Sequence, residues 1–558
     1  MKKITLLLIA YHFSLFTISA QVWKWGRQGT SSSATMRNAL VADKSGNVYV
    51  TGPFEDTISF GSFHLNSSAP TEVFLVKYDS SGNVKWAKQS HSTPTSNCFQ
   101  SYLSLDDSGN VYLMGAYHDT VTFGTFTLNG ISGTNNAFVA KYDANGNIKW
   151  AKAPVCASAV SNAIITSVAF DPKDNMLVTG DFSDTLTFGA TALINSGTIT
   201  TFLVQYNPAG NVVWASTSSA PSGYSTNEPI KVMVDAQGNA YVSGLYSDTL
   251  TFGAFTIINT YQGSTNDYLV KYDSSGNILW LAYTGTPSAS SACYSNSAAI
   301  DSKGNVYITG NFSDTAIFGS DSINDSIYAA YIAKYDNSGN IVWVKHANNN
   351  TIGYSLAADS LDRLYFSSTL YNTDTAAFLG DTLITNAGLN PVFVMKLDTN
   401  GNVLCKNIIR TGGNANIACS KSGKYVYISG TLNDTITFNH DLLHGNDTSL
   451  SALFVSRWNP CYTAPNGIDE MAGDNYGVIV YPNPSHGTFT FQIKNEELKN
   501  KNIVEVYNML GEKVYSKQLT KDSEQWTIDL SNQSSGIYLY RIITESGSLV
   551  SDGKLIIE

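Results

Sequence analysis

Charge is scarce in this chain. Only 14% of its 558 residues are Asp, Glu, Lys or Arg, and 33 basic against 44 acidic residues give a net charge of −11. No basic cluster interrupts this acidic balance, so the sequence lacks the electrostatic footprint of a nucleic-acid-binding protein. We therefore expect no nucleic-acid partner.

Long apolar runs are absent after the first twenty residues. A transmembrane helix needs about 20 consecutive apolar residues, and no later segment approaches that length. Residues 1–20 begin with two lysines, continue through the apolar run Ile4–Ala10 and end in small residues before Gln21. This is the pattern of a secretory signal peptide. A membrane anchor is the alternative, but polar residues at positions 11, 12 and 14 interrupt the run. We expect a secreted chain with no transmembrane segment.

Residues for catalysis and metal binding are also few. The six cysteines form no C-x-x-C pair and the histidines form no H-E-x-x-H motif, so no metal site is predicted. Glycoside hydrolysis normally uses two carboxylates, yet residues 22–461 contain only Glu55, Glu72 and Glu228 as glutamates. No nucleophile elbow or phosphate-binding loop is present. We assign no catalytic residue, metal or cofactor.

What the chain does contain is a repeat. A D-x-x-G-N turn followed by a Val-Tyr strand begins at Asp43, Asp106, Asp235 and Asp301, and looser copies begin at Asp171, Asp359 and Ser420. These starts lie 58 to 66 residues apart. A second turn of the same kind follows about 35 residues later in six units. It leads to a Trp in five of them, as in Lys77–Trp86, and to Cys405 in the sixth. Gly-Asn turns between short apolar runs predict β-hairpins.

Each repeat therefore predicts four antiparallel strands, which is the blade of a β-propeller. The seventh unit has a third strand, Leu453–Trp458, but no fourth. Residues Trp23–Gln28 align with the fourth strand of the first unit, Val84–Gln89. We predict that the N-terminal strand completes the last blade and closes a seven-bladed ring over residues 21–461. An open solenoid is the alternative, and it would leave its end sheets unpaired.

Most recurring polar and aromatic residues are predicted to be architectural. The turn aspartates are expected to accept hydrogen bonds from the turn backbone, whereas a calcium loop would need several more oxygen ligands. A third block, Phe54–Gly61 in the first unit, places an Asp before Thr once in each repeat. The recurring Trp residues are expected to fill gaps between blades, with an aromatic sugar-binding ring as the sharper alternative.

The C-terminal segment has a different pattern. After a linker at 462–477, residues 478–558 contain seven short strands and predict a small β-sandwich. The segment contains Tyr481-Pro482-Asn483-Pro484, Gly487, a hairpin at Gly511, Gly536 and a final strand with Lys554. In this order the residues resemble a type A sorting domain of the type IX secretion system. The resemblance implies export through the periplasm to the outer surface of a Gram-negative bacterium, with the secretion machinery as partner. A carbohydrate-binding or adhesive sandwich is the alternative.

The repeats themselves resemble the SBBP-type bacterial β-propeller repeat, through the element Asp43–Gly52. That resemblance implies a fold and no activity. Binding is expected in the connections that vary between units, because variable loops on a rigid scaffold commonly carry it. Tyr224, Tyr261 and Tyr294 are the candidate contacts to a glycan or protein ligand. The overall prediction is a monomeric, non-catalytic binding protein; the alternative is a polysaccharide hydrolase or lyase with its site in the propeller channel.

Overall fold

A computed structural model places most of the chain. It describes residues 23–31, 38–158, 161–195, 199–220, 227–261, 264–348, 350–371, 375–378, 381–384, 390–409, 415–432, 435–438, 441–444, 452–460, 478–493, 502–519, 525–544 and 549–558. The expected signal peptide, the expected linker and Tyr224 lie outside this part. The chain divides into two compact units, residues 1–462 and 463–558.

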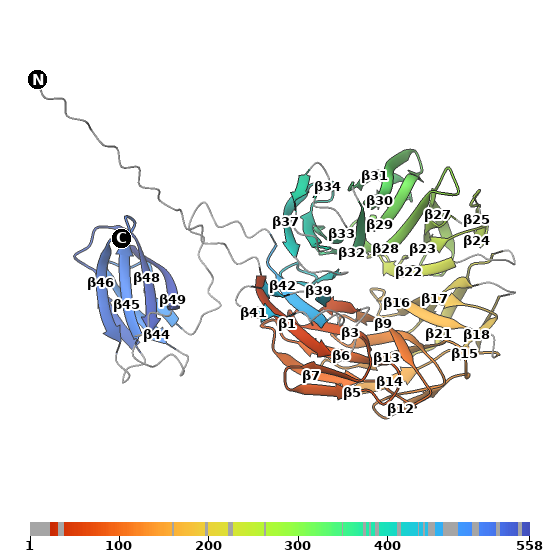
Figure 1. The fold of residues 1–558 in the computed structure, drawn as a ribbon, viewed down its shortest axis with the longest axis horizontal. Coiled ribbons are helices and arrows are strands. Elements are labelled where there is room, and N and C mark those ends of the chain that lie inside the picture. The colour runs from red at the N-terminus through yellow and green to blue at the C-terminus, as the bar shows by residue number, and fades with distance from the viewer. Residues whose placement is uncertain are drawn as a thin grey trace, which may run out of the picture. The chain divides into compact units, whose positions relative to one another are not determined.

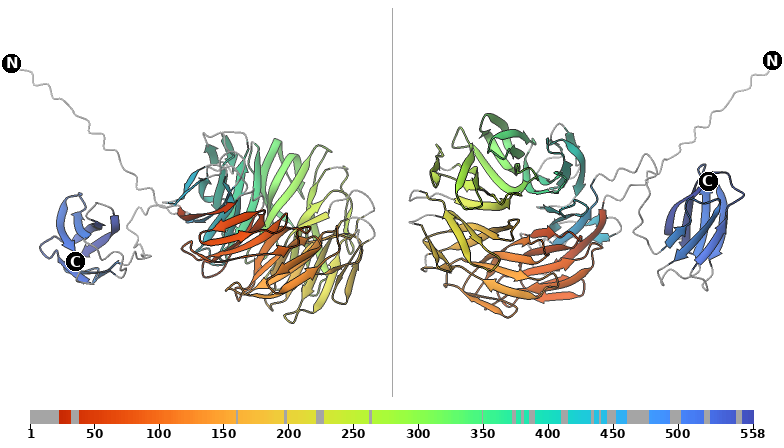
Figure 2. Two further views of the ribbon diagram at one scale, coloured as in Figure 1. Left: turned by 60° about the horizontal axis from the view of Figure 1, so that its bottom comes forward. Right: turned by 180° about the vertical axis from the view of Figure 1, so that it is seen from behind.

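The first unit consists of four-stranded antiparallel groups that radiate around a centre (Figures 1 and 2). Among the described residues the pairings give seven such groups, numbered blades 1 to 7 in chain order. The strands of blades 1 to 3, from the innermost outward, are β2 (Ala39–Ala42), β3 (Val48–Phe54), β6 (Glu72–Tyr78) and β7 (Val84–Gln89); β9 (Cys98–Leu105), β10 (Val111–Tyr117), β13 (Asn136–Tyr142) and β14 (Ile148–Lys152); and β16 (Ala163–Phe170), β17 (Met176–Phe182), β20 (Thr200–Tyr206) and β21 (Val212–Thr217).

The remaining blades have the same strand order. Those of blades 4 to 7 are β22 (Asn227–Val234), β23 (Ala240–Tyr246), β26 (Asn266–Tyr272) and β27 (Ile278–Gly285); β28 (Ala292–Ile300), β29 (Val306–Phe318), β30 (Asp321–Tyr335) and β31 (Ile341–His346); β32 (Thr351–Ala358), β33 (Leu364–Leu370), β36 (Val392–Leu397) and β37 (Val403–Ile409); and β38 (Ala415–Cys419), β39 (Val426–Leu432), β42 (Ala452–Trp458) and β1 (Trp23–Ser31). The fold is an all-β propeller.

The ring is closed by the N-terminal strand. β1 pairs antiparallel with β42 from Trp23 opposite Trp458 to Gly29 opposite Leu453, and the two strands lie side by side in Figure 1. The Ser456 hydroxyl also donates to the Trp25 carbonyl at 2.8 Å. This confirms the expected pairing of the two ends, which gives the last blade its fourth strand.

The repeated turns have the geometry expected from their Asp and Gly. In the first of them, Asp43 Oδ1 accepts the backbone N–H groups of Ser45 and Asn47 at 2.9 Å each. Asp43 Oδ2 accepts the Asn47 side-chain amide at 2.6 Å, and Gly46 has a positive φ of 82°. The side chain thus fixes a tight turn before the second strand.

The third block of each repeat forms a further hairpin, which the sequence pattern had not predicted as strands. Asp56, Asp119, Asp184 and Asp314 have positive φ values between 49° and 64°, a conformation that Asp tolerates better than most residues. The hairpin strands outside blade 5 are β4 (Thr57–Phe60), β5 (Phe63–Asn66), β11 (Thr120–Phe123), β12 (Phe126–Asn129), β18 (Thr185–Phe188), β19 (Thr191–Ile194), β24 (Leu250–Phe252), β25 (Phe255–Ile257), β34 (Thr375–Phe378), β35 (Asp381–Ile384), β40 (Ile436–Phe438) and β41 (Asp441–Leu443).

Several of these hairpins pair with chain that leaves the preceding blade. β4 pairs with the end of β1, β11 with β8 (His91–Ser92), β18 with β15 (Val155–Cys156) and β29 with the end of β27. Neighbouring blades are therefore joined by backbone hydrogen bonds as well as by side chains. Parts of the connections expected to be variable loops are ordered in this way.

The second unit is a two-sheet β-sandwich. Its strands are β43 (Val478–Tyr481), β44 (Thr488–Ile493), β45 (Asn502–Asn508), β46 (Lys513–Leu519), β47 (Gln525–Asp529), β48 (Gly536–Thr544) and β49 (Leu549–Ile557). One sheet has the order β43-β44-β47 and the other β46-β45-β48-β49. Buried side chains such as Phe489, Val504, Trp526 and Ile542 form its core. All seven strands expected from the sequence are present.

Candidate binding pocket between blades 2 and 3

One contact recurs between neighbouring blades. At five interfaces the Trp of the outer strand lies over the Gly of the next blade's outer turn, and its indole N–H donates to a carbonyl in that turn. The bonds are Trp25 to Ser80 at 2.9 Å, Trp86 to Ala144 at 3.2 Å, Trp214 to Ser274 at 3.3 Å, Trp280 to Asn337 at 3.1 Å and Trp343 to Thr399 at 3.2 Å. This seal explains the recurring Trp as a structural residue.

A Gly is required beneath the indole. A Cβ added at Gly146 would lie 2.8 Å from the Trp86 ring, and Gly146 has a φ of +80°. Glycine is therefore favoured at this position for two reasons: the backbone has a positive φ, and the Trp86 ring approaches too closely for a Cβ.

The interface between blades 2 and 3 breaks this rule. Trp150 occupies the same register, but its indole N–H donates no hydrogen bond within the described part of the chain. The nearest group to a Cβ added at Gly210 is Lys152 Nζ, at 2.9 Å, instead of an indole ring. The turn itself remains closed, because Asn207 Oδ1 accepts the Asn211 N–H at 3.0 Å.

The interface between blades 2 and 3 contains larger side chains than the interface between blades 1 and 2. Phe170 and Met176 stand where blade 2 has Leu105 and Val111, and the Phe170 ring lies 4.7 Å from that of Tyr112. Close-packed interfaces yield when a side chain grows. We infer that these residues hold the blades apart and so keep Trp150 from the turn.

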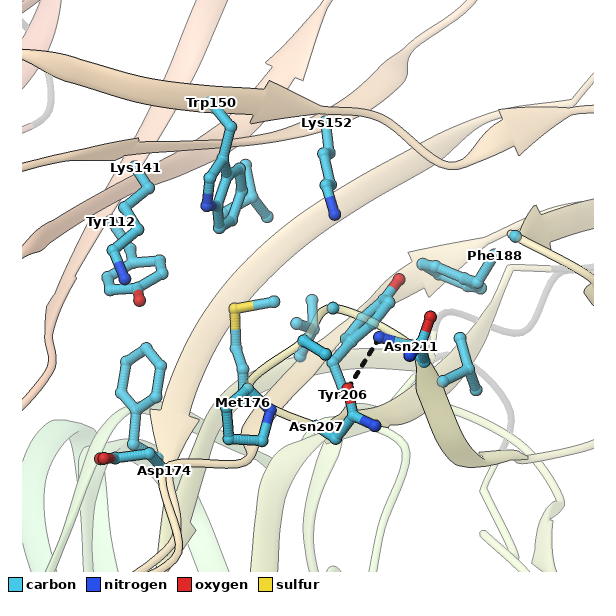
Figure 3. A pocket seen from close by; sticks show the side chains of 18 of the residues that line it. Tyr112, Lys141, Trp150, Lys152, Asp174, Met176, Phe188, Tyr206, Asn207 and Asn211 are labelled. Atoms are coloured by element: carbon cyan, nitrogen blue, oxygen red, sulfur yellow. Dashed lines mark hydrogen bonds between the residues drawn. The ribbon is translucent and has the colours of Figure 1, made fainter.

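The space that remains is a pocket of about 830 Å³. This volume is typical of a small-molecule site. Trp150 and Lys152 of β14 form one wall, and Tyr206, Asn207 and Asn211 of blade 3 form the other (Figure 3). Tyr206 is partly exposed here, whereas its counterpart in blade 2, Tyr142, is only 3% exposed.

Charges in the pocket are only partly neutralised. Lys141 lies 3.4 Å from Asp106 Oδ2 and over the Tyr112 ring. Lys152 lies over the Trp150 ring, 5.4 Å from its centroid. Within the described residues neither Lys152 nor Asp174 has an ion-pair partner. Aromatic faces thus alternate with amide, ammonium and carboxylate groups, an arrangement that can stack on a ring while it hydrogen-bonds its hydroxyl groups.

Two of the tyrosines expected from the sequence, Tyr261 and Tyr294, do not line this pocket. Tyr261 is 39% exposed in the loop after β25, and Tyr294 is partly buried in β28. The missed signal was the set of departures in the third repeat, where Leu177, Gln205 and Asn207 replace the usual Tyr, Lys and Asp. When one unit departs from the shared residues at several positions, its contacts with the neighbouring blade are expected to differ from those of the other units.

A buried carboxyl group lies on another interface, between blades 3 and 4. Burial and the neighbouring charge of Glu228 raise the pKa of Asp181 to about 8, and Asp181 is only 7% exposed. A raised carboxyl pKa next to a second carboxylate is one mark of an acid catalyst. No group of three His, Cys, Asp or Glu that could hold a metal ion occurs among the residues described.

Cysteine chemistry is limited in the described residues. Cys98, Cys156, Cys293 and Cys419 are free, and Cys405 is disulfide-bonded. Cys405 stands in β37 where the other outer strands carry the sealing Trp. Among the strands and turns described there is also no helix long and apolar enough to cross a membrane.

The C-terminal motif residues shape the sandwich. The Asn483 side chain donates to the Lys554 carbonyl at 2.7 Å and accepts the Ile556 N–H at 2.9 Å, which ties the Tyr481–Pro484 segment to β49. Gly487 has a φ of +105° and leaves no room for a Cβ beside Ser531. Gly511 lies at the tip of the β45–β46 hairpin, and Gly536 begins β48.

Comparison with known proteins identifies this second unit. Residues 479–558 match the family described as the secretion system C-terminal sorting domain. The sorting domain indicates export by type IX secretion to the cell surface or the extracellular space. It also implies that the chain interacts with the secretion machinery.

The chain is also similar to a curated protein at low sequence identity. An uncharacterized WD repeat-containing protein of Acanthamoeba polyphaga mimivirus is 25% identical over 393 residues, which cover 57% of this chain and 27% of the viral protein. The chain thus spans about a quarter of that relative's length.

Solved structures resemble it at low identity. The Dos1 propeller is 9% identical and covers 79% of this chain and 96% of its own, with a TM-score of 0.38. A protein of unknown function from Dyadobacter fermentans is 10% identical and covers 77% and 96%, with a TM-score of 0.33. These similarities say nothing about function.

Proposed function

We propose that this chain is a non-catalytic secreted or surface protein of a Gram-negative bacterium that binds a glycan in the pocket between blades 2 and 3. The observation that carries the proposal is the unsealed interface, where Trp150 and Tyr206 line the pocket together with Asn207 and Asn211. Export by the sorting domain would place this pocket outside the cell. The SBBP-type character of the repeats belongs to the same proposal.

A glycan fits the pocket better than a flat protein surface does. The walls are concave, and aromatic rings of Trp150 and Tyr206 stand beside groups that donate and accept hydrogen bonds. Sugars offer both an apolar ring face and hydroxyl groups. Small-ligand sites commonly combine apolar walls with a few polar groups in this way.

The proposal is tested by binding of the full chain to a glycan array, followed by affinity measurements on any sugar that binds. Trp150→Ala and Tyr206→Ala should each weaken binding about tenfold, which corresponds to about 1.4 kcal/mol. Trp214→Ala is the matched control, because Trp214 has the same register in a sealed interface; its affinity should not change. Equal loss in all three variants, or no glycan bound, would overturn the proposal.

A polysaccharide-degrading enzyme is the second candidate, favoured by the raised pKa of Asp181 beside Glu228. If the chain is such an enzyme, it should degrade a polysaccharide, and the Asp181→Asn and Glu228→Gln variants should each lose this activity. Such turnover would replace the binding proposal with an enzymatic one. Binding without turnover would exclude this candidate for the glycans tested.

The export claim has its own test. Deletion of residues 478–558 should leave the propeller in the periplasm of the producing bacterium. Unchanged export of the shortened chain would contradict the assignment of the sorting domain, whatever the propeller binds.

A further inference from the structure

The β45–β46 hairpin of the sorting domain ends in the same kind of turn as the propeller hairpins. Asn508 Oδ1 accepts the N–H groups of Leu510 and Glu512 at 3.0 Å each, and the Gly511 N–H donates to the Asn508 carbonyl at 2.9 Å. In blade 1, Asp79 Oδ1 accepts the N–H groups of Ser81 and Asn83 at 3.0 and 2.9 Å. The backbone geometry is set by the Asn or Asp and the Gly, and not by the two residues at the tip.

Those two tip residues differ sharply between the turns. Met509 is 62% exposed and Leu510 is 86% exposed, the highest value among the large exposed hydrophobic residues described. The corresponding propeller positions mostly carry small or polar residues, such as Ser80-Ser81, Ala144-Asn145, Ser274-Ser275 and Asn337-Ser338. Leu361 of blade 6, at 66% exposure, is a single large apolar residue in such a turn. Since Ser-Ser satisfies the turn, the Met-Leu pair is not needed to form it.

The base of this hairpin is held rigidly. The Glu505 carboxylate accepts from the Tyr507 hydroxyl at 2.7 Å, Lys513 at 3.0 Å and Arg541 at 2.7 Å. These bonds lower the pKa of Glu505 to about 2 and join β45, β46 and β48. The apolar tip therefore stands on a preorganised support, which reduces the ordering cost of binding.

We propose that Met509 and Leu510 form the anchor by which the secretion machinery recognises the sorting domain, and that they insert into an apolar pocket of the machinery component that receives it. The inference rests on export through this domain. Contiguous exposed apolar side chains are a mark of interaction sites. A hot spot of binding commonly consists of a few residues that enter a pocket of the partner.

The test measures export of the full chain in the producing bacterium. Met509→Ser/Leu510→Ser gives the tip the blade 1 sequence, and it should lower the exported fraction at least tenfold with the chain retained in the periplasm. Met509→Leu/Leu510→Met keeps the tip apolar and should restore export. Leu361→Ser is the matched control in a propeller turn and should be exported like the wild type. Wild-type export of the Ser-Ser variant would overturn the inference.

Two measurements on purified full chain separate the anchor from other roles. The Ser-Ser variant should keep the protease resistance and unfolding midpoint of the sorting domain; their loss would show that the side chains serve the fold and would overturn the inference. Sedimentation should give the same mass for both proteins. Self-association that the substitution abolishes would make a second copy of the chain the occupant and would likewise overturn the inference.

Discussion

Blade 2 contacts its two neighbours through the same strands and turns, but one interface is closed by a Trp and the other contains a pocket. Towards blade 1, Trp86 covers Gly146 and bonds to Ala144, and the indole is 8% exposed. Towards blade 3, Trp150 does not cover Gly210 of the equivalent turn. A pocket lies between Trp150 and that turn. The comparison teaches that a repeat can create a site by failing to make one standard contact, without adding any new element.

The largest expected difference is in stability. Trp86→Ala should lower the free energy of unfolding of the propeller by about 3–5 kcal/mol, because it empties a buried interface. Trp150→Ala should cost about 1 kcal/mol, since one face of its ring already borders the pocket. Denaturant unfolding followed by far-UV circular dichroism measures both. Equal losses would contradict the distinction between a sealed and an open interface.

A third interface extends the comparison to charge. Asp267 of blade 4 lies at 2% exposure and accepts bonds from blade 5, from the Ser295 N–H at 2.6 Å, the Cys293 thiol at 3.2 Å and the Tyr331 hydroxyl. Burial outweighs these donors and raises the pKa of Asp267 to about 6. The folded chain therefore binds a proton more tightly than the unfolded chain, whose Asp titrates near about 3.9.

Stability should consequently be greatest below about pH 4 for this group and should fall as the pH rises to about 6, by about 3 kcal/mol in all. Asp267→Asn should make the fall in stability between about pH 4 and pH 6 shallower in denaturant unfolding. The slope that remains and continues towards pH 8 belongs to Asp181, and Asp181→Asn should remove that part. A wild-type stability that rises over this range would contradict the expected direction of the change.

The next prediction would close the open interface. Phe170→Leu and Met176→Val install the blade 2 residues in blade 3. Pro208→Ala, added to them, gives the outer turn of blade 3 the alanine that blade 2 has at Ala144, since Pro208 also lines the pocket. Trp150 should then move onto the turn, and glycan affinity should fall about tenfold or more as the pocket shrinks. Acrylamide quenching, compared with the same variant carrying Trp150→Phe, reports the exposure of this one indole. If Trp150 remains as accessible to acrylamide as before, the inference that Phe170 and Met176 hold blades 2 and 3 apart is contradicted.

The smallest effect concerns the charge of the pocket. Lys152→Gln should change the affinity for a neutral glycan by less than about threefold, because a solvent-exposed charge contributes little. The affinity for an acidic glycan should fall more, and the loss should diminish at high salt. Titration calorimetry at two salt concentrations provides the measurement.

The sequence was sufficient for the architecture because the information is repeated. The turns at Asp43 and its counterparts, the alignment of Trp23–Gln28 with a fourth strand and the seven C-terminal strands each followed from local spacing. The hairpins of the third block pair within their own repeat, as Thr57–Phe60 does with Phe63–Asn66. They were missed because strands of only three or four residues are too short to show a clear alternation of apolar and polar residues. The pocket was missed because it depends on the relative sizes of Phe170, Met176 and the residues facing them across an interface.

The pairing of β1 with β42 has a consequence for the order of folding. The strand that completes the last blade precedes its partner by more than 400 residues, as the Ser456–Trp25 bond across 431 positions shows. The entropy of joining such distant segments must be overcome before the ring exists. β1 therefore remains without its partner strand until β42 has been synthesised. A chain that ends before β42 lacks the strand with which β1 pairs in the closed ring.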